Sequence, residues 1–264
     1  MDEETRAKLA EVALKQVVYR IQGMDDVPVR RDIAYKTTAE GALLMDIYYP
    51  PAATPGTRVP LVVIILGFPD PQSGGRMFGP LTSWARLIAM SGIAAAIYGT
   101  SIPAEDAHDA FTYLRENASS LGIDPRRIGV YAASGNVAVA LSLLMRDADF
   151  RCVALLKGYT FDVDGSTAFA EASRQYGFVN ATTGRSIDEL PADLPMFVQR
   201  AGREHFPGVN AALDQFAARA LARNLPLTFV NDATGTHAAD MDDDTDATRR
   251  IIRQVLDFLR LHLV

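Results

Sequence analysis

Two hydrophobic patterns alternate along most of the chain. Continuous aliphatic runs, such as residues 61–66, are typical of strands buried on both faces of a parallel sheet. Apolar residues spaced by three and four positions, as in residues 81–90, indicate amphipathic helices. The patterns predict strands over 29–37, 42–49, 61–66, 93–98, 151–156, 196–200 and 227–231, and helices over 5–21, 81–90, 103–119, 135–146, 208–223 and 245–261. This alternation predicts one α/β domain, residues 1–264, with a mostly parallel, doubly wound sheet flanked by helices.

Three segments add to this basic alternation. The first two strands are joined through Glu40-Gly41, which is a hairpin signal. Residues 1–24 form a helical extension that either covers an edge of the sheet or contacts a second copy of the chain, so a homodimer is a candidate assembly. Residues 158–193, with a helical pattern over 166–176, are short for a full lid. They predict a small cap and therefore small substrates.

Composition narrows the classes of partner. The 264 residues are 48% hydrophobic, ample for a core, and carry a net charge of −6 with scattered basic residues, which gives no reason to expect nucleic acid. Cys152 is the only cysteine, so there is no disulfide framework and no thiolate metal cluster; its apolar run predicts a buried structural thiol. No apolar stretch approaches the roughly 20 residues of a membrane span. The acidic N-terminus lacks a signal-peptide core, so we expect a cytoplasmic protein that does not enter membranes.

An acidic run over residues 240–246 invites interpretation as a calcium loop. The run lacks the glycine and the distal glutamate of an EF-hand. It precedes a predicted helix, and acidic side chains are favourable at helix N-termini. We therefore expect a solvated helix start, and no metal site is predicted.

The most informative stretch leads from the turn at 122–127 through a buried strand to Ala132-Ala-Ser134-Gly-Asn136 and an apolar helix. This is the layout of a nucleophile elbow, where a tight turn between strand and helix exposes a serine hydroxyl. Small neighbours are needed because bulky side chains would collide in so tight a turn. The usual G-x-S-x-G signature is replaced at both outer positions, by Ala132 and Asn136. The Asn136 amide is a candidate brace for the elbow or for a neighbouring loop.

A serine nucleophile needs a base and a third group that orients the base. Of the four histidines, His237 alone follows a predicted strand directly and precedes the last helix, which places it at the same sheet edge as Ser134. Glu204 follows strand 196–200 and is the preferred acid, because the order nucleophile, acid, histidine is that of α/β-hydrolases. Asp162, after the preceding strand, is the alternative acid.

The same edge supplies candidates for an oxyanion hole and a substrate pocket. One backbone N–H donor is expected from Gly135, at the start of the elbow helix, and the second from Phe68, after strand 61–66. A set of apolar residues near predicted loop or helix starts at this edge provides candidate pocket residues, although core packing would account for them equally well. The residues chosen as substrate-binding are Met77, Tyr159 and Phe206.

The chain resembles α/β-hydrolase-fold serine esterases of the dienelactone-hydrolase-like bacterial branch from about residue 29 to its end. The motifs that carry the resemblance are Ile-Leu-Gly67-Phe-Pro, Gly122-Ile-Asp-Pro-Arg-Arg-Ile-Gly-Val-Tyr, Ala132-Ala-Ser134-Gly-Asn, Arg200-Ala-Gly-Arg-Glu204 and Thr236-His237. Dienelactone hydrolases proper use a cysteine nucleophile, whereas this chain has Ser134, so a general carboxylesterase fits better.

The resemblance implies an α/β-hydrolase fold and a serine hydrolase for small or short-chain esters. Ser134 would attack the carbonyl, His237 would act as general base and Glu204 would hold the imidazole. The N–H groups of Phe68 and Gly135 would stabilise the oxyanion, and no cofactor would be needed. Thioesters, lactones and small amides would use the same groups. The alternative from a different class is a catalytically silent protein of this fold that binds a small molecule or a protein partner.

Overall fold

The computed structural model describes residues 10–54, 56–70, 74–147, 149–161 and 167–264. Its strands form one eight-stranded sheet in the order β1-β2-β4-β3-β5-β6-β7-β8. Strand β2 is antiparallel to β1 and β4, and the other neighbours are parallel. The strands are β1 Val29–Thr38, β2 Gly41–Tyr48, β3 Val59–Ile64, β4 Ala94–Tyr98, β5 Ile123–Ala133, β6 Val153–Leu156, β7 Met196–Arg203 and β8 Leu227–Thr236.

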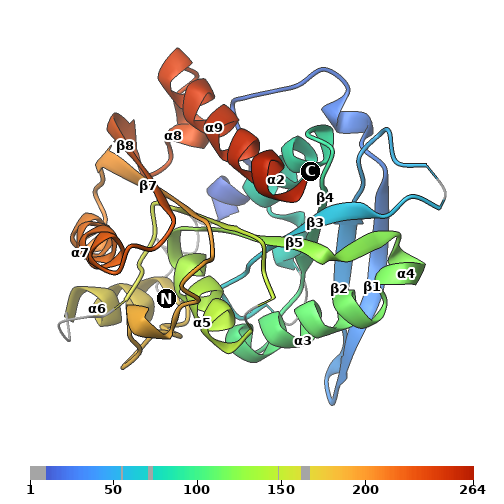
Figure 1. The fold of residues 1–264 in the computed structure, drawn as a ribbon, viewed down its shortest axis with the longest axis horizontal. Coiled ribbons are helices and arrows are strands. Elements are labelled where there is room, and N and C mark those ends of the chain that lie inside the picture. Colours follow the sequence, from blue (N-terminus) through green and yellow to red (C-terminus); the bar gives the residue numbers. More distant parts are fainter. Residues whose placement is uncertain (1–9, 55, 71–73, 148, 162–166) are drawn as a thin grey trace.

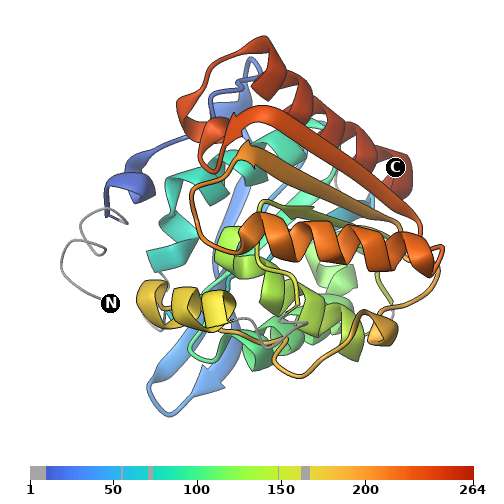
Figure 2. The ribbon, with the colours of Figure 1, turned by 90° about the vertical axis from the view of Figure 1, so that its left-hand side faces the viewer.

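Helices cover both faces of the sheet. Figure 1 shows α2 and α9 on one side of the strands and α3 and α5 on the other, and Figure 2 shows the neighbouring strands β7 and β8 from the side. The helices are α2 Gly79–Met90, α3 Pro103–Glu116, α4 Ala118–Leu121, α5 Val137–Arg146, α6 Thr167–Tyr176, α7 Val209–Ala222, α8 Ala239–Asp242 and α9 Asp246–Leu263. Short 3-10 turns are η1 Met24–Asp26, η2 Gly74–Met77, η3 Ser134–Asn136 and η4 Ile187–Glu189.

The aliphatic run at β3 contributes side chains to the hydrophobic core on both faces of the sheet. Leu61, Val63 and Ile65 pack with α3, α5 and α7, whereas Val62 and Ile64 pack with α2 and α9. Each of these five side chains is 0% exposed. Because successive side chains of a strand point to opposite faces, a strand between two helical layers must be apolar at every position. This confirms the predicted doubly wound sheet, and the hairpin of β1 and β2 also forms as predicted.

Two element boundaries differ from the prediction. Residues 123–127, predicted as a turn, belong to β5, because Ile123 is fully buried and pairs with Val59 of the neighbouring strand. The helix predicted over 103–119 ends at Glu116. There Asn117 donates from its side-chain amide to the carbonyl of Tyr113, which competes with continuation of the helix.

The N-terminal helix is shorter than predicted. Within the described residues it covers only 10–14, and residues 15–21, predicted as helix, are irregular. Val17 is 1% exposed in the core on the α2 and α9 side, and the N–H of Val18 donates to the carbonyl of Asp240. Burial of Val17 and this long-range hydrogen bond outweigh the weak helical preference of β-branched residues. Residues 1–9 lie outside the described residues, so a dimer contact made by this segment stays a prediction.

No helix within the described ranges is long and apolar enough to cross a membrane. The location in the cytoplasm stays a prediction.

Candidate active site

Ser134 lies at the sharp turn between β5 and α5. Its φ of +57° is in the left-handed region, which non-glycine residues seldom adopt, and this places the hydroxyl at the tip of the turn. The neighbouring backbones approach so closely that side chains could not be added there. A Cβ at Gly67 would lie 2.5 Å from the carbonyl oxygen of Gly135, and a Cβ at Gly158 would lie 2.3 Å from that of Ser134. The small residues around the serine are therefore required by packing.

Asn136 ties the elbow to the loop after β3. Its side-chain oxygen accepts a 2.7 Å hydrogen bond from the N–H of Gly67, and Asn136 is 8% exposed. The carbonyl of Gly67 in turn accepts from the N–H of Val179. The amide braces both the elbow and its neighbouring loop, which accounts for asparagine where the usual signature has glycine.

Ser134, His237 and Glu204 form one continuous chain of hydrogen bonds. The Nε2 atom of His237 lies 2.8 Å from the Oγ of Ser134, and its Nδ1 lies 2.6 Å from the Oε2 of Glu204. The three residues follow β5, β8 and β7, whose carboxyl ends meet at one edge of the sheet. The sequence places them 70 and 33 positions apart, and the parallel sheet brings them together.

Backbone groups hold the acid in place. The Oε1 atom of Glu204 accepts from the N–H groups of His205 at 2.9 Å and Phe206 at 3.0 Å, which leaves Oε2 for His237. Burial opposes ionisation of Glu204, but the histidine ring and these two N–H groups hold its pKa below the ordinary value. Both carboxylate oxygens are thus engaged, and the side chain is 2% exposed.

Burial is the main influence on the base. It lowers the pKa of His237, and the Glu204 carboxylate offsets only part of that effect. The imidazole is therefore neutral near pH 7. In this form Nδ1–H donates to Glu204 and Nε2 accepts from the serine hydroxyl, which is the arrangement a general base requires.

The other predicted candidates lie elsewhere. His108 pairs with Asp147 at 2.7 Å, His262 is in the last turn of α9, and His205 points its side chain into solvent, 65% exposed. Asp162, the alternative acid, falls outside the described residues. Met77, predicted as substrate-binding, is 64% exposed and is not among the residues around the serine cavity.

A cavity of about 80 Å³ opens beside the serine. Its walls combine predicted residues with four that the sequence reasoning missed. The predicted ones are Phe68, Ser134, Tyr159, Phe206 and His237, and the missed ones are Lys157, Tyr176, Phe178 and Val209. Phe178 packs directly on the elbow, since a Cβ at Gly135 would lie 2.7 Å from its ring.

The missed residues differ in how far the sequence signals them. Lys157 follows an apolar strand directly, at the same edge as the serine and the histidine, so the rule that located those two could have found it. Tyr176 and Phe178 come from the variable segment, and nothing in their local pattern marks them.

Asp240 departs from the predicted solvated helix start, whereas Asp242 and Asp244 of the same acidic run are exposed as predicted. The carboxylate of Asp240 accepts from Nζ of Lys157 and, at 3.0 Å, from Nε1 of Trp84. Burial opposes its ionisation, but Lys157 and Trp84 hold its pKa below the ordinary value. Acidic residues at a helix start are usually exposed, but Asp240 is paired with Lys157 and only 12% of its side chain is exposed. No group of three or more potential metal-ligating side chains occurs among the described residues.

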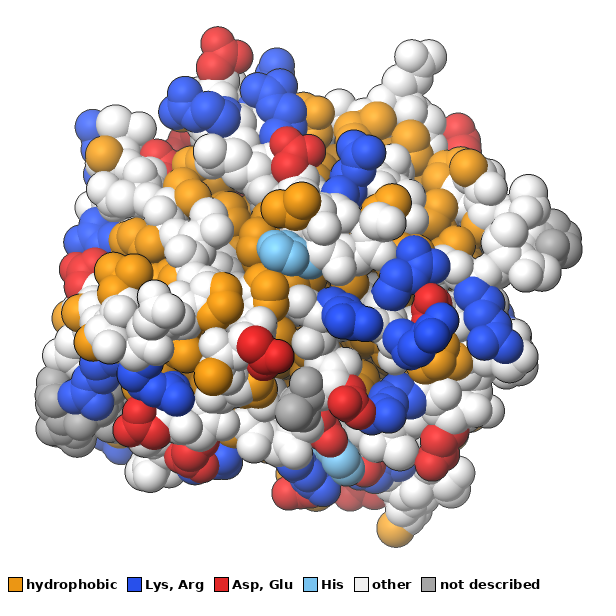
Figure 3. Space-filling view, viewed as in Figure 1, with side chains coloured by type: hydrophobic (Ala, Val, Ile, Leu, Met, Phe, Trp, Pro, Cys, Tyr) orange, Lys and Arg blue, Asp and Glu red, His pale blue; other side chains and the backbone are white. Residues whose placement is uncertain are grey.

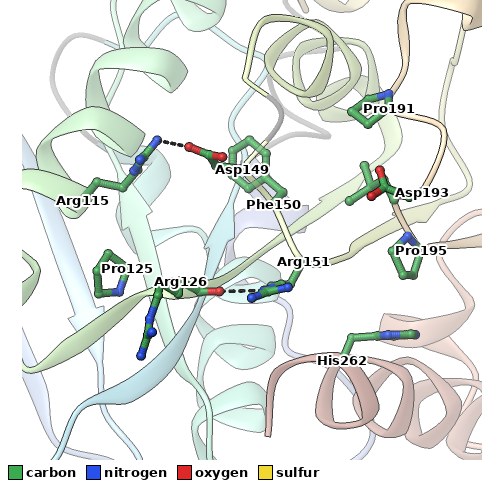
Figure 4. A pocket seen from close by; sticks show the side chains of 11 residues that line it. Arg115, Pro125, Arg126, Asp149, Phe150, Arg151, Pro191, Asp193, Pro195 and His262 are labelled. Carbon is green, nitrogen blue, oxygen red and sulfur yellow. Dashed lines mark hydrogen bonds and ion pairs between the residues drawn. The ribbon is translucent and has the colours of Figure 1, made fainter.

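A larger hollow lies at the opposite edge of the sheet. It measures about 550 Å³ and is lined from the amino ends of β5, β6 and β7 and the end of α9. Figure 4 shows Arg115 paired with Asp149, and Arg151 donating to the carbonyl of Arg126. In Figure 3, Lys and Arg side chains gather to the right of the centre of the face, with acidic side chains among them.

Comparisons with known proteins place the fold. No protein-family model matches the chain, and no curated protein matches its sequence. The structure is similar to a thermostable esterase from Pseudomonas putida ECU1011, with a TM-score of 0.77, 15% identity, and coverage of 99% of this chain and 90% of that one. A bacterial heroin esterase is similar with a TM-score of 0.71 and 16% identity, and the match covers 100% of this chain and 98% of that one. Carboxyl esterase 2 from the mycorrhizal fungus Tuber melanosporum is similar with a TM-score of 0.68 and 16% identity, and the match covers 100% of both chains.

These similarities confirm the predicted α/β-hydrolase fold. At this level of identity they concern the fold, and the dienelactone-hydrolase-like branch stays a prediction.

Proposed function

We propose that the protein is a serine hydrolase that cleaves small carboxylic esters through an acyl-enzyme intermediate. The observation that carries the proposal is the unbroken relay from Glu204 through His237 to the hydroxyl of Ser134. A fold alone does not define a reaction, whereas a serine–histidine–carboxylate relay beside a cavity is the arrangement that nucleophilic acyl transfer requires. The proteins of similar structure whose names include esterase support the same class.

The relay supplies each proton transfer of the reaction. As the Oγ of Ser134 forms a bond to the ester carbonyl carbon, Nε2 of His237 takes the hydroxyl proton. Collapse of the tetrahedral intermediate breaks the bond to the alcohol oxygen, which leaves with that proton. Water then attacks the acyl-serine by the same route and releases the carboxylic acid. Glu204 keeps the ring oriented and stabilises its charged form in both halves.

The loop after β3 and the start of the elbow helix would stabilise the oxyanion. Both backbone groups of Gly67 are engaged, by Asn136 and Val179, which fixes the loop against the elbow. The next N–H, of Phe68, and the N–H of Gly135 are the proposed donors. A donor held in place before the reaction needs no reorganisation when charge develops, and each such donor is worth about 10²–10³ in turnover.

The cavity favours short acyl groups without charge. Its volume is small, about 80 Å³, so we expect it to suit an acyl chain of a few carbon atoms. Aromatic side chains dominate its walls, and the single ammonium group there, of Lys157 among the described residues, is paired with Asp240. Acetyl and propionyl esters fit this description.

Hydrolysis of p-nitrophenyl acetate and butyrate by the wild type and Ser134→Ala tests the proposal. We expect turnover by the wild type and a loss of about 10⁴-fold or more in the variant. Ser83→Ala is a control serine substitution, because the Ser83 hydroxyl is buried and has no hydrogen-bond partner among the described residues. A fluorophosphonate probe followed by mass spectrometry should label Ser134. Wild-type turnover no faster than that of Ser134→Ala would instead support the silent binding protein.

A further inference from the structure

Lys157 occupies an unusual position at the carboxyl end of β6. It is one of the few described non-glycine residues with positive φ, at +41°, and it is 5% exposed. Its N–H donates to the carbonyl of Gln199 on β7 at 2.8 Å. A long, charged side chain on a left-handed backbone in the interior persists only where its surroundings hold it.

The backbone of Lys157 leads directly to the nucleophile. The next residue, Gly158, packs on the carbonyl of Ser134 and on the side chain of Val137, at the start of the elbow helix. The residue after that, Tyr159, enters the wall of the serine cavity. The left-handed turn at Lys157 therefore sets the position of the segment against which the elbow rests.

The side chain of Lys157 leads to the base. Its Nζ pairs with Asp240, which lies in α8 three residues after His237. Trp84 from α2 donates to the same carboxylate, and the carbonyl of Asp240 accepts from Val18. The loop that carries His237 is thus held through Asp240, which makes one ion pair with Lys157 and accepts hydrogen bonds from Trp84 and Val18.

We propose that Lys157 is a positioning residue that couples the elbow of Ser134 to the loop of His237, through its backbone on one side and its ion pair with Asp240 on the other. This inference rests on the proposed function, because it assigns a role to the pair in the same reaction. The pair fixes the separation of the serine oxygen and the imidazole, and its two charges act on the imidazole in opposite directions.

Among the described residues, charged or titratable groups surround His237 from several elements, and they include Tyr159 and Tyr176 in the wall of the same cavity. Glu204 contacts its Nδ1, and His205 lies 6.1 Å away between ring centroids. Lys157 lines the same cavity as His237 and is paired with Asp240. The Lys157 ammonium lowers the pKa of His237, whereas the Asp240 carboxylate raises it. Replacing one partner at a time therefore displaces this pKa in opposite senses.

The test compares Lys157→Met with Asp240→Asn in the full chain. In Lys157→Met the lowering effect of the ammonium group is lost while Trp84 still donates to Asp240, so we expect the pKa of His237 to rise by about half a unit or more. In Asp240→Asn we expect it to fall by a similar amount. The acid limb of kcat/KM should move to higher pH in the first variant and to lower pH in the second. We also expect kcat to fall by about 10- to 100-fold in both, because the triad is misplaced.

Lys36→Met is the matched control. This substitution also breaks an ion pair with a buried carboxylate, that of Asp106. Lys36 lies on β1, which is the edge strand at the opposite end of the sheet from β8 and its histidine loop. Lys36→Met should lower thermal stability and leave the acid limb unchanged. If Lys157→Met does not fold, Asp240→Asn decides alone, because Asn keeps the size of the side chain and one of the two acceptor oxygens that Lys157 and Trp84 use.

Titration of the His237 imidazole by NMR, with His237→Gln to assign its signal, gives the same pKa without turnover. Absence of Ser134-dependent hydrolysis would therefore refute the proposed function while leaving this measurement intact. Unchanged pKa values, or a displacement in the same direction in both variants, would overturn the coupling role of Lys157.

Discussion

The two edges of the sheet show how little the size of a hollow says about chemistry. At the amino edge, a hollow of about 550 Å³ is lined by arginines such as Arg126, whose side chain is 84% exposed. At the carboxyl edge, a cavity of only about 80 Å³ is lined by His237 and Lys157. These two side chains are paired with Glu204 and Asp240, and all four are largely removed from water. Exposed charges interact weakly with one another, whereas buried paired charges hold fixed positions and have altered pKa values. The smaller cavity is therefore the one for which we propose catalysis.

The largest expected difference between the edges comes from removing the acid. Glu204→Gln should lower kcat by about 10³- to 10⁴-fold, because an amide can stabilise neither the required tautomer nor the imidazolium. Arg151→Ala, at the amino edge, should leave kcat within about twofold. Both are measured with p-nitrophenyl acetate. If Asp162→Asn lowers kcat more than Glu204→Gln does, the role of the acid belongs to Asp162 instead.

The next largest effect is expected at the brace of the elbow. Asn136→Ala removes the acceptor for the N–H of Gly67, so the loop that carries the proposed Phe68 donor is no longer fixed. We expect kcat to fall by about 10- to 100-fold with a small change in KM, as for other losses of positioning. Asn136→Asp keeps an acceptor oxygen and should retain more activity than Asn136→Ala. Equal losses in both variants would contradict a role for this hydrogen bond.

Acyl-chain length should have a smaller effect. A series of p-nitrophenyl esters from acetate to octanoate should show kcat/KM falling beyond about four carbon atoms, because the cavity holds few groups of methylene size. Phe178→Ala opens the wall over Gly135 and should move the optimum towards longer chains by about 10-fold in relative kcat/KM. Val209→Ala, elsewhere in the wall, removes much less volume and serves as a control. An optimum at long chains in the wild type would contradict the predicted size limit.

The smallest effect is the position of the acid limb. The pKa of His237 is below its ordinary value of 6.5, chiefly because of burial, so kcat/KM should decline only below about that pH. The unfolded chain binds a proton at this residue more readily than the folded one, so its contribution to stability is lost as the pH falls below 6.5. Glu204 acts in the same direction at lower pH, because its folded-state pKa is also depressed. A limb centred above pH 7 would contradict this ordering.

The sequence predicted those features that depend on periodicity and on strand ends. The apolar run at β3 required a doubly covered strand, and the rule that parallel strands end at one edge brought Ser134, Glu204 and His237 together. Glycine and alanine around Ser134 marked the tight turn. These inferences need only local pattern and a general property of parallel sheets.

Features that depend on tertiary contacts could not be predicted from the hydrophobic pattern of the sequence. Asp240 resembles other acids at helix starts in its local sequence, and only the folded chain shows that it pairs with Lys157, the residue after β6. Val17 fitted a helical stripe, but its burial ends the helix early. Phe178 has no periodic neighbours that would place it on the elbow. In each case a contact between residues distant in sequence outweighs the local signal.

The length of the acid side chain has a consequence for how this loop can change. One carboxylate oxygen of Glu204 is fixed by the backbone of the following two residues while the other reaches the ring. Aspartate is shorter by one methylene group and could not bridge both partners from the same Cα position. Aspartate at position 204 would therefore function only if the main chain after β7 shifted towards His237. Without that shift, Glu204→Asp would leave the imidazole without its hydrogen bond to a carboxylate.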